Sequence, residues 1–339
     1  MEKKRLIGMT LEELRGVCAE CGLPPFAAKQ IARRLYVNRA QSIDEMTEIS
    51  VRGRQALNDR YCVGLSAPKA SALSSDGTLK ALFEGRGGRD VEAVFIPDHD
   101  RATLCVSSQA GCKMACRFCM TGRQGFHGNL SSADILNQIL SIPGSEQLTN
   151  IVFMGMGEPM DNLPEVLKAI EVLTAPWGLA WSPKRITVSS IGKLPELKQL
   201  LDQTKVHVAI SVHSPFSAER AELMPVEKVW PVERVIELLR DYDFAHQRRL
   251  TLEYIVWRGI NDDMRHADAL ARLVRGVDCR VNLIRYHSLP DSDLQTASEQ
   301  RMTAFRDRLN EKGVTATIRA SRGEDIQAAC GMLAGEAKE

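Results

Sequence analysis

Cys105-Val-Ser-Ser-Gln-Ala-Gly-Cys112-Lys-Met-Ala-Cys116-Arg-Phe-Cys119 gathers four of the nine cysteines of this 339-residue chain into one short stretch. The remaining five are scattered along the sequence. Cysteines in a chain without a secretion signal are thiols or metal ligands more often than disulfides. The crowding therefore predicts a local metal or redox function for this stretch.

The spacing of Cys112, Cys116 and Cys119 distinguishes between kinds of metal site. Structural zinc usually takes four ligands from two pairs, and the only other close pair, Cys18 and Cys21, is distant in sequence. Iron–sulfur clusters are normally held by four cysteines. Three cysteines leave one iron open, and an open iron can bind the amino and carboxylate groups of S-adenosylmethionine. We therefore predict a 4Fe-4S cluster held by these three thiolates and used for radical chemistry.

Outward from this stretch, the sequence alternates between strand and helix patterns. Strands are expected at 103–107, 150–154, 185–190, 206–212, 250–256, 280–285 and 314–319. Helices are expected at 131–141, 163–174, 232–242, 264–275 and 299–311. The alternation predicts an α/β fold with a parallel sheet. No G-x-G-x-x-G follows the first strand, so a full or partial barrel is favoured over a dinucleotide-binding sheet.

Three segments are expected along the chain. Residues 1–65 read as a helical domain, with a capping box formed by Thr10 and Glu13 and a stop at Gly22. Residues 66–98 read as a small β element with a hairpin turn at 75–78. Residues 99–335 form the barrel domain.

Composition limits the cellular context but not the ligand. The net charge is +1, so RNA would have to be bound by local basic clusters. No stretch approaches the roughly 20 apolar residues of a membrane span, and the first residues lack a secretion signal. We expect a cytoplasmic protein without membrane contact. The candidate phosphate contacts are Lys29, Arg33, Arg34, Lys184, Arg185, Arg319 and Arg322.

Reactive groups gather at the carboxyl ends of the strands of a parallel barrel. The second strand leads into Gly157 and Glu158, where a glycine permits close approach of a ligand and a carboxylate can accept from an ammonium group. Cys105 and Cys330 also fall near these ends. Free cysteines are often small buried apolar groups, so the residues alone leave open whether these two form a transient redox pair.

The cysteine stretch, together with Phe153-Met-Gly-Met-Gly-Glu-Pro159 and Asp325-Ile-Gln-Ala-Ala-Cys330-Gly, resembles the RlmN/Cfr family of radical methyltransferases. The resemblance spans about residues 91–334. It implies a radical SAM partial (β/α)6-type barrel preceded by an RNA-contacting accessory domain. It also implies methylation of an adenine ring carbon in 23S rRNA. The RlmN branch methylates C2 and also acts on the adenosine beside the tRNA anticodon, whereas the Cfr branch methylates C8.

The resemblance assigns a two-step mechanism to particular residues. A first S-adenosylmethionine methylates Cys330, and a second gives the radical that takes a hydrogen from that S-methyl group. The carbon radical adds to the adenine, and Cys105 then attacks Cys330 to release the product and leave a disulfide. Glu92 falls where RlmN has its proposed proton acceptor. Glu92 and Pro159, where Cfr proteins usually carry Ala, favour C2.

The same resemblance implies a cofactor-binding set and partners. The contacts with S-adenosylmethionine are Gly157, Glu158, Ser189, Ser211, Val212, His213 and His287. His287 departs from the family, which usually has Asn there. The expected partners are 23S rRNA, tRNA and a flavodoxin- or ferredoxin-type electron donor, and the chain is expected to be a monomer. The alternatives are C8 methylation and a non-catalytic zinc-containing RNA-binding protein.

Overall fold

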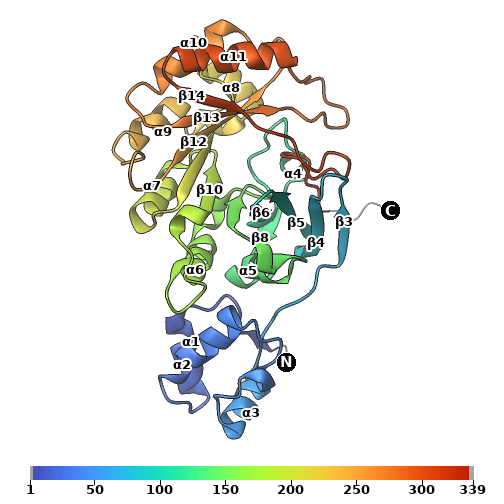
Figure 1. Ribbon diagram of the computed structural model, residues 1–339, viewed down its shortest axis with the longest axis vertical. Coiled ribbons are helices and arrows are strands. Elements are labelled where there is room, and N and C mark those ends of the chain that lie inside the picture. The colour runs from blue at the N-terminus through green and yellow to red at the C-terminus, as the bar shows by residue number, and fades with distance from the viewer. Residues whose placement is uncertain (1–2, 336–339) are drawn as a thin grey trace.

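A computed structural model describes residues 3–335 and contains one ten-stranded sheet with the strand order β14-β13-β12-β11-β10-β9-β6-β5-β4-β3. Figure 1 shows this sheet in the middle and upper part of the molecule, with helices outside it. The strands are β3 (Ala70–Leu73), β4 (Leu79–Arg86), β5 (Arg89–Asp98), β6 (Arg101–Cys105), β9 (Asn150–Phe153), β10 (Ile186–Ser190), β11 (His207–Ser211), β12 (Leu250–Val256), β13 (Arg280–Arg285) and β14 (Thr315–Ile318).

The seven strands from β6 to β14 are all parallel and follow one another in chain order. A doubly wound sheet would reverse its strand order at a switch point, and this sheet does not. The prediction of a partial barrel is therefore confirmed. The crossover helices are α5 (Ser132–Ser141), α6 (Leu163–Thr174), α7 (Leu194–Gln203), α8 (Ser217–Leu223), α9 (Val232–Leu239), α10 (Met264–Leu273) and α11 (Glu299–Glu311).

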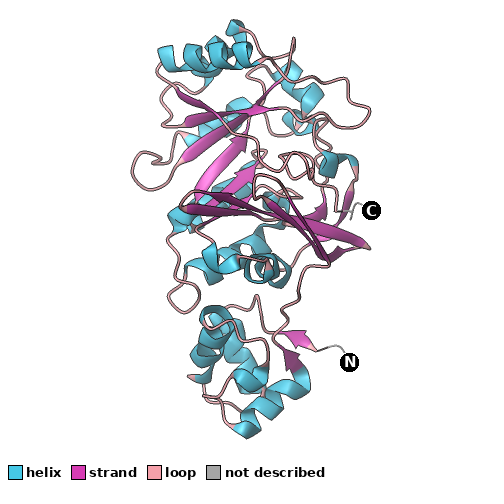
Figure 2. Ribbon diagram, turned by 45° about the vertical axis from the view of Figure 1, so that its right-hand side comes forward, coloured by secondary structure: helices cyan, strands magenta, loops and turns pink. Residues whose placement is uncertain are grey.

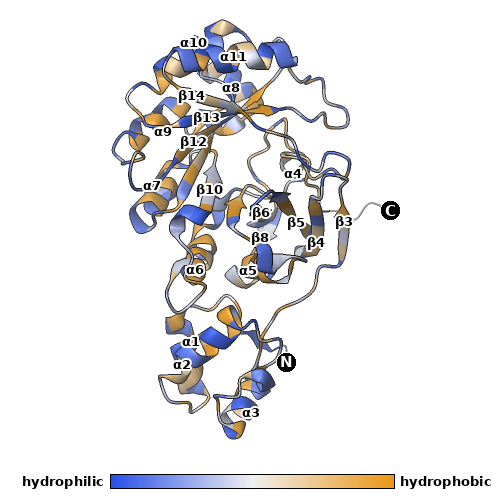
Figure 3. Cartoon of the chain, in the orientation of Figure 1, coloured by the Kyte–Doolittle hydropathy of each residue, from blue (hydrophilic) through white to orange (hydrophobic). Residues whose placement is uncertain are grey.

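Hydrophobic periodicity explains why these elements form where they do. The buried strands are nearly continuous apolar runs, as in β12, because helices cover one face and the packed interior the other. Figure 3 shows the hydrophobic colour concentrated on the central strands and mixed with hydrophilic colour on the outer helices. Each expected strand and helix of the barrel is present within two or three residues of its predicted bounds.

The part of the chain around the cysteines holds short elements that the periodicity did not reveal. These are the hairpin of β7 (Gln109–Gly111) with β8 (Phe126–Asn129), and the single turn α4 (Met120–Arg123) between them. Short 3-10 turns are η2 (Ile43–Glu45), η3 (Ser145–Gln147), η4 (Pro159–Asn162), η5 (Pro183–Arg185) and η6 (Pro225–Lys228).

The amino-terminal part of the chain is mostly helical and lies at the bottom of Figure 1. The capping box of Thr10 and Glu13 begins its first helix. Ser132 Oγ donates to the Gly8 carbonyl across the boundary at 2.9 Å, and Lys168 pairs with Glu13 at 2.7 Å, so the domain is anchored on α5 and α6. Its elements are β1 (Lys4–Arg5), α1 (Leu11–Glu20), α2 (Ala27–Ala32), the π-helical turn η1 (Arg33–Val37), α3 (Val51–Arg60) and β2 (Tyr61–Cys62).

The β element at 66–98 is continuous with the barrel sheet. β5 pairs antiparallel with β6, and β4 and β3 extend the sheet beyond it. Figure 2 shows these strands continuing the main sheet across the middle of the molecule. The hairpin turn predicted at 75–78 is present between β3 and β4.

The two edges of the sheet, β14 and β3, are joined by the segment that follows β14. The Gly323 amide donates to Asp76 at 3.0 Å, and Ser74 Oγ donates to Asp325 at 2.5 Å. Figure 1 shows this segment running from β14 past β5 and β4. It carries Cys330, so this sulfur is held between the two edges of an open sheet.

No helix within residues 3–335 is long and apolar enough to cross a membrane.

Candidate active site

A cavity lies at the carboxyl ends of the parallel strands, as the barrel topology predicts. Its wall includes residues from the segments that follow β6, β9, β10, β11 and β14. The strands β12 and β13 contribute Glu253, Ile255 and Ile284 from within the strands themselves. Of the predicted site residues it includes Cys112, Cys116, Cys119, Gly157, Glu158, Ser189, Ser211, His213 and Cys330. We call this space, of about 160 Å³, the inner cavity.

The three predicted cluster ligands share one wall of the inner cavity. Burial raises the pKa of the Cys112 thiol to about 12 and raises those of Cys116 and Cys119, with mutual repulsion adding to the effect. Buried thiolates at this spacing need a positive partner. Within residues 3–335 no three His, Cys, Asp or Glu side chains converge to hold a single metal ion. Three thiols on one wall of the inner cavity are the donor set that would hold an iron–sulfur cluster with one iron left open.

The loop after β9 places a carboxylate in the inner cavity. Gly157 has φ +98°, and a Cβ there would lie 2.5 Å from the Gln109 Cβ, so only glycine fits this close approach. Gln109 Oε1 accepts from the Glu158 amide at 2.8 Å, which fixes the loop. Burial raises the pKa of Glu158 to about 7, although hydrogen bonds from Ser190 and the Ile191 amide oppose the shift.

Glu253, on β12, is a second buried carboxylate in the inner cavity, and the sequence analysis missed it. Its Oε1 accepts from Asn282 at 3.0 Å, while its buried Oε2 has no hydrogen-bond partner in the described chain. Across residues 3–335, neither Glu158 nor Glu253 has a cationic side chain within ion-pair distance. Arg319 is near enough to Glu253 to oppose the rise in its pKa, whereas no cation opposes the raised pKa of Glu158. A buried carboxylate without a cation fits a cationic ligand, and S-adenosylmethionine carries an ammonium and a sulfonium.

His213 is held in one orientation and one protonation state. Its backbone has φ +61°, and its Nδ1 accepts from the Ile255 amide at 3.0 Å. Burial, helped by Arg220, lowers the pKa of His213 to about 3, so the ring is neutral. Because Nδ1 is an acceptor, the proton lies on Nε2. The ring therefore offers an N–H donor to a ligand in the inner cavity.

Arg220 on α8 holds the loops after β10 and β11 together, a role that no sequence pattern indicated. Its guanidinium donates to the carbonyls of Ile191 at 3.1 Å, Ser211 at 2.9 Å and Val212 at 3.0 Å. It also pairs with Glu227, and both side chains are almost fully buried. Val212, which was predicted to contact the cofactor, is buried and does not line the inner cavity. Its carbonyl accepts the hydrogen bond from Arg220.

Replacing Arg220 with Met is expected to lower the free energy of unfolding by about 3–5 kcal/mol, because Glu227 is left buried and unpaired. Urea denaturation of the purified protein measures this. The exposed pair of Arg234 and Glu237 supplies the control, and Arg234→Met is expected to change stability little. Equal stability of the Arg220→Met variant and the wild type would contradict the assigned role.

Cys330 and Cys105 lie close enough for the charge of Cys330 to raise the pKa of Cys105. Cys330 is exposed and lines the cavity, whereas Cys105 is buried at the end of β6. Burial raises the pKa of Cys105 to about 12, and the neighbouring Cys330 adds to the shift. Arg319 lies beside both sulfurs, and its own pKa is raised chiefly by Cys330. Both cysteines are free thiols here.

Glu92 lies on β5 behind the Cys330 segment. Its carboxylate accepts from Lys80 at 2.9 Å and from the amides of Ala334 at 2.7 Å and Gly335 at 3.2 Å. It does not line the inner cavity. The contacts show that Glu92 fixes the chain just after Cys330.

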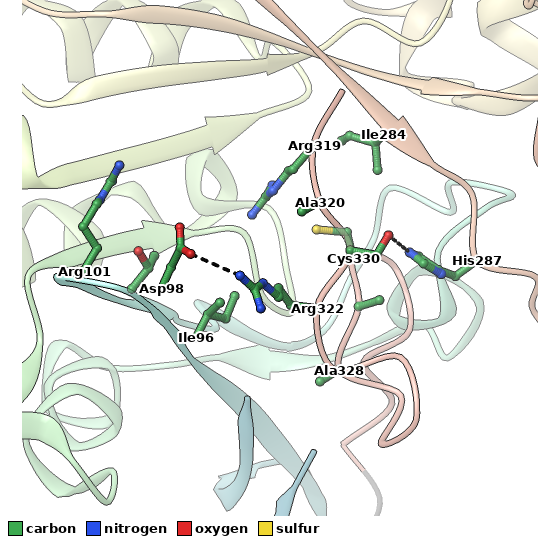
Figure 4. Close-up of a pocket in the computed structure, with 13 residues that line it drawn as sticks. Ile96, Asp98, Arg101, Ile284, His287, Arg319, Ala320, Arg322, Ala328 and Cys330 are labelled. Carbon is green, nitrogen blue, oxygen red and sulfur yellow. Dashed lines mark hydrogen bonds and ion pairs between the residues drawn. The ribbon is translucent and has the colours of Figure 1, made fainter. Parts of the chain in front are cut away.

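His287, a predicted cofactor contact, lies outside the inner cavity. It lines a second space of about 280 Å³, which we call the outer cavity, and its Nε2 lies 3.1 Å from Ser321 Oγ. Figure 4 shows the outer cavity with Cys330 and His287 on one side. The two cavities share Ile284, Arg319 and Cys330, so the Cys330 sulfur lies on their common wall.

The candidate phosphate contacts fall into three groups. Arg319 and Arg322 line the outer cavity. Arg34 pairs with Glu48, while Lys29 and Arg33 are exposed in the amino-terminal domain. Arg185 donates to the Leu148 carbonyl at 2.7 Å and stacks on Trp181, so it has a structural role. Lys184 lies at the end of the strands opposite the inner cavity.

Two family models match the chain. Residues 106–271 match the radical SAM superfamily, and residues 4–63 match the ribosomal RNA large subunit methyltransferase N-terminal domain. A probable dual-specificity RNA methyltransferase RlmN from Parabacteroides distasonis is 56% identical over 333 residues, covering 98% of this chain and 97% of the relative. The dual-specificity RNA methyltransferase RlmN of Syntrophus aciditrophicus is 41% identical, covering 100% and 99%.

A solved structure has the same architecture over its whole length. The crystal structure of a radical SAM methyltransferase from Sphaerobacter thermophilus superposes with a TM-score of 0.92. It is 35% identical, and the match covers 98% of this chain and 100% of that one.

Proposed function

The chain belongs to the RlmN family of radical SAM RNA methyltransferases, and from this premise we propose that it methylates C2 of adenosine in 23S rRNA and in tRNA. The observation that carries the proposal is that the cysteine triplet and Cys330 line one cavity. The relatives are named dual-specificity enzymes, which supports both RNA classes and disfavours the Cfr-type C8 alternative.

The inner cavity is proposed to hold the cofactors. Cys112, Cys116 and Cys119 would bind a 4Fe-4S cluster, with S-adenosylmethionine contacted by Glu158, His213 and the loops after β10 and β11. When bound, these groups supply a one-electron cleavage that yields a 5'-deoxyadenosyl radical. The buried carboxylates supply negative charge for the ammonium, and the His213 Nε2–H supplies a donor.

Cys330 is proposed to carry the methyl group and Cys105 to release the product. Cys330 lines both cavities. A group that receives a methyl group on one side and transfers it on the other needs this position. Cys105 is buried beside it and can attack the Cys330 sulfur only after transfer, leaving a disulfide. A flavodoxin- or ferredoxin-type donor is proposed as the source of electrons.

Glu92 is proposed as the proton acceptor for the methylated adenine. Its carboxylate is engaged by Lys80 and by the amides of Ala334 and Gly335. Acceptance of a proton from the base therefore requires the Cys330 segment to shift, which links this step to movement of the methyl carrier.

Anaerobic reconstitution tests the proposal. The purified chain with iron, sulfide, S-adenosylmethionine and a reductant is incubated with unmodified 23S rRNA fragments or tRNA, and nuclease digests are analysed by mass spectrometry. The expected product is 2-methyladenosine. Formation of 8-methyladenosine would overturn the choice of carbon, and a colourless zinc protein without iron would overturn the radical chemistry.

We expect the affinity for S-adenosylmethionine to decrease as the pH is lowered, because Glu158 becomes protonated. Because burial raises the pKa of this carboxyl to about 7, it becomes neutral below that pH and no longer attracts the ammonium. The dissociation constant should rise about tenfold per pH unit below the pKa. Equilibrium binding from acid to neutral pH measures this, and the Glu158→Gln variant should bind weakly with little pH dependence. A pH-independent constant in the wild type would exclude Glu158 from the contact.

A further inference from the structure

A third cavity, of about 230 Å³, lies at the amino ends of four neighbouring parallel strands, and we call it the amino-end cavity. Its wall includes residues at, or just before, the first residues of β10, β11, β12 and β13. These strands have five to seven residues. At about 3.3 Å per residue, the amino-end cavity lies roughly 15–25 Å from the inner cavity. A ligand bound there is therefore separate from the cofactors proposed for the inner cavity.

Three exposed cationic side chains line the amino-end cavity without a partner. Lys184, Arg249 and Arg280 each come from the start of a different strand. None of the three side chains makes a hydrogen bond or ion pair with any residue that the structure describes. Among the described residues of the wall, only Asp278 carries a carboxylate. The cavity therefore holds a surplus of positive charge.

The carboxyl ends of the neighbouring helices do not account for these three cations. Basic side chains often bind the free carbonyls at such ends. Arg240 does so, donating to the Leu273 carbonyl at 3.1 Å, and Arg248 Nη2 donates to the Leu201 carbonyl at 2.8 Å. The three exposed cations make no such bond, so their donors are available to a ligand.

Arg248, which belongs to the wall of the same cavity, is a buried cation. Its side chain is almost fully buried, and its Nε and Nη1 have no hydrogen-bond partner in the part of the chain that the structure describes. Burial lowers the pKa of Arg248, and Tyr242 and Asp202 oppose this shift without pairing with it. Because a buried charge is costly unless it is compensated, an anion in the adjoining cavity would stabilise this guanidinium.

His207 adds a hydrogen-bond donor to the amino-end cavity without adding charge. Its Nδ1 accepts from the Arg249 amide at 2.8 Å, so the proton of the neutral ring lies on Nε2. Burial lowers the pKa of His207 to about 4, and the charges of Arg249 and Lys184 add to the effect. Both cations are thus close enough to act on one imidazole.

We propose that the amino-end cavity binds a phosphate group, held by Lys184, Arg249 and Arg280. Guanidinium groups bind phosphate through paired N–H donors, and a tetrahedral oxyanion offers an oxygen to each of several donors from different strands. The phosphate is either free, as inorganic phosphate or on a nucleotide, or a phosphodiester of RNA remote from the methylated base. The bound anion would relieve the repulsion among the cations and tie together the starts of β10, β12 and β13. This site goes beyond the proposed methyl transfer, which does not use it.

Thermal unfolding tests the site. The Tm of the purified chain is measured in sodium phosphate and in sodium chloride at equal ionic strength and pH. A ligand that binds only the folded state stabilises it, so the wild-type Tm should be about 2 °C higher in phosphate at about ten times the dissociation constant. Arg249→Ala and Arg280→Ala should each weaken phosphate binding about tenfold and lose most of this increase.

Further measurements separate lost binding from misfolding. In chloride, the Arg249→Ala and Arg280→Ala variants should be at least as stable as the wild type, because each removes repulsion between like charges. Asp278→Asn should strengthen phosphate binding a few-fold, a gain that misfolding would not produce. The matched control is Arg258→Ala, which removes an exposed arginine just beyond the other end of β12 and should keep the full increase in Tm.

A second arm identifies the source of the phosphate. The wild type and the Arg249→Ala and Arg280→Ala variants are titrated with a fluorescently labelled RNA duplex. An increase in Tm with inorganic phosphate that both variants lose assigns the site to free phosphate. Weaker duplex binding by both variants, without such an increase in the wild type, assigns it to the RNA backbone. Variants that match the wild type both in phosphate and on the duplex would overturn the site.

Discussion

Replacement of Cys330 with Ala is expected to abolish RNA methylation, a loss of at least about 10³-fold, because a covalent carrier has no substitute. The structure gives no other thiol that is exposed to both cavities among the residues it describes. Intact-protein mass spectrometry should show one added methyl group on the wild type after incubation with S-adenosylmethionine, and none on the variant.

Cys279→Ala is the matched control for Cys330, since Cys279 lies in a different pocket near α10. It should retain both the added methyl group and RNA methylation. Iron content of the Cys330→Ala variant should equal that of the wild type, since Cys330 is not a proposed ligand. Turnover by the Cys330→Ala variant would reject the carrier mechanism.

Replacement of Cys105 with Ala is expected to trap the protein covalently on RNA, since the base would be attached before release becomes possible. A denaturing gel should show a slow band that disappears on nuclease treatment. Multiple turnovers should fall by at least about 10³-fold, while the first attachment proceeds. Normal product release by this variant would reject the resolving role.

The release step should also accelerate with pH. Burial raises the pKa of Cys105 to about 12, and a thiol attacks as its thiolate. Below that pKa the thiolate fraction of Cys105 grows about tenfold for each unit of increasing pH. The rate of product release in a single turnover of the wild type should therefore rise by the same factor. A release rate that is flat with pH would indicate that Cys105 is deprotonated by a specific base.

The parts of the fold with strong periodicity were predictable from sequence. β12, β13, α6 and α11 begin and end where their patterns predict, because long apolar runs and amphipathic helices have few alternative structures. The cysteine triplet could also be singled out from sequence, because its spacing is local, and the structure places its three sulfur-bearing residues on one cavity wall. The β7–β8 hairpin was not predictable, because its two strands are short and enclose a loop.

Residues whose role depends on contacts far apart in sequence were missed. Arg220 carries no motif, and its importance appears only when α8 brings it against three loop carbonyls. Glu253 lies in the mostly apolar strand β12, and a single carboxylate within such a strand belongs to no recognisable motif. His287 was expected in the inner cavity, and the chain path after β13 turns it to the outer one. His287 therefore lines the outer cavity and not the inner one.

The sheet of this protein is an open barrel with β14 and β3 at its two edges. The segment that connects these edges is the one that carries Cys330. In a barrel closed by strand pairing, opening the ring breaks a whole ladder of hydrogen bonds. Here the bridge is fastened by a few contacts to the β3–β4 turn and to Glu92. A bulky ligand that spreads the ring must stretch this bridge and displace the sulfur. The curvature of the sheet and the position of the Cys330 sulfur are therefore expected to change together.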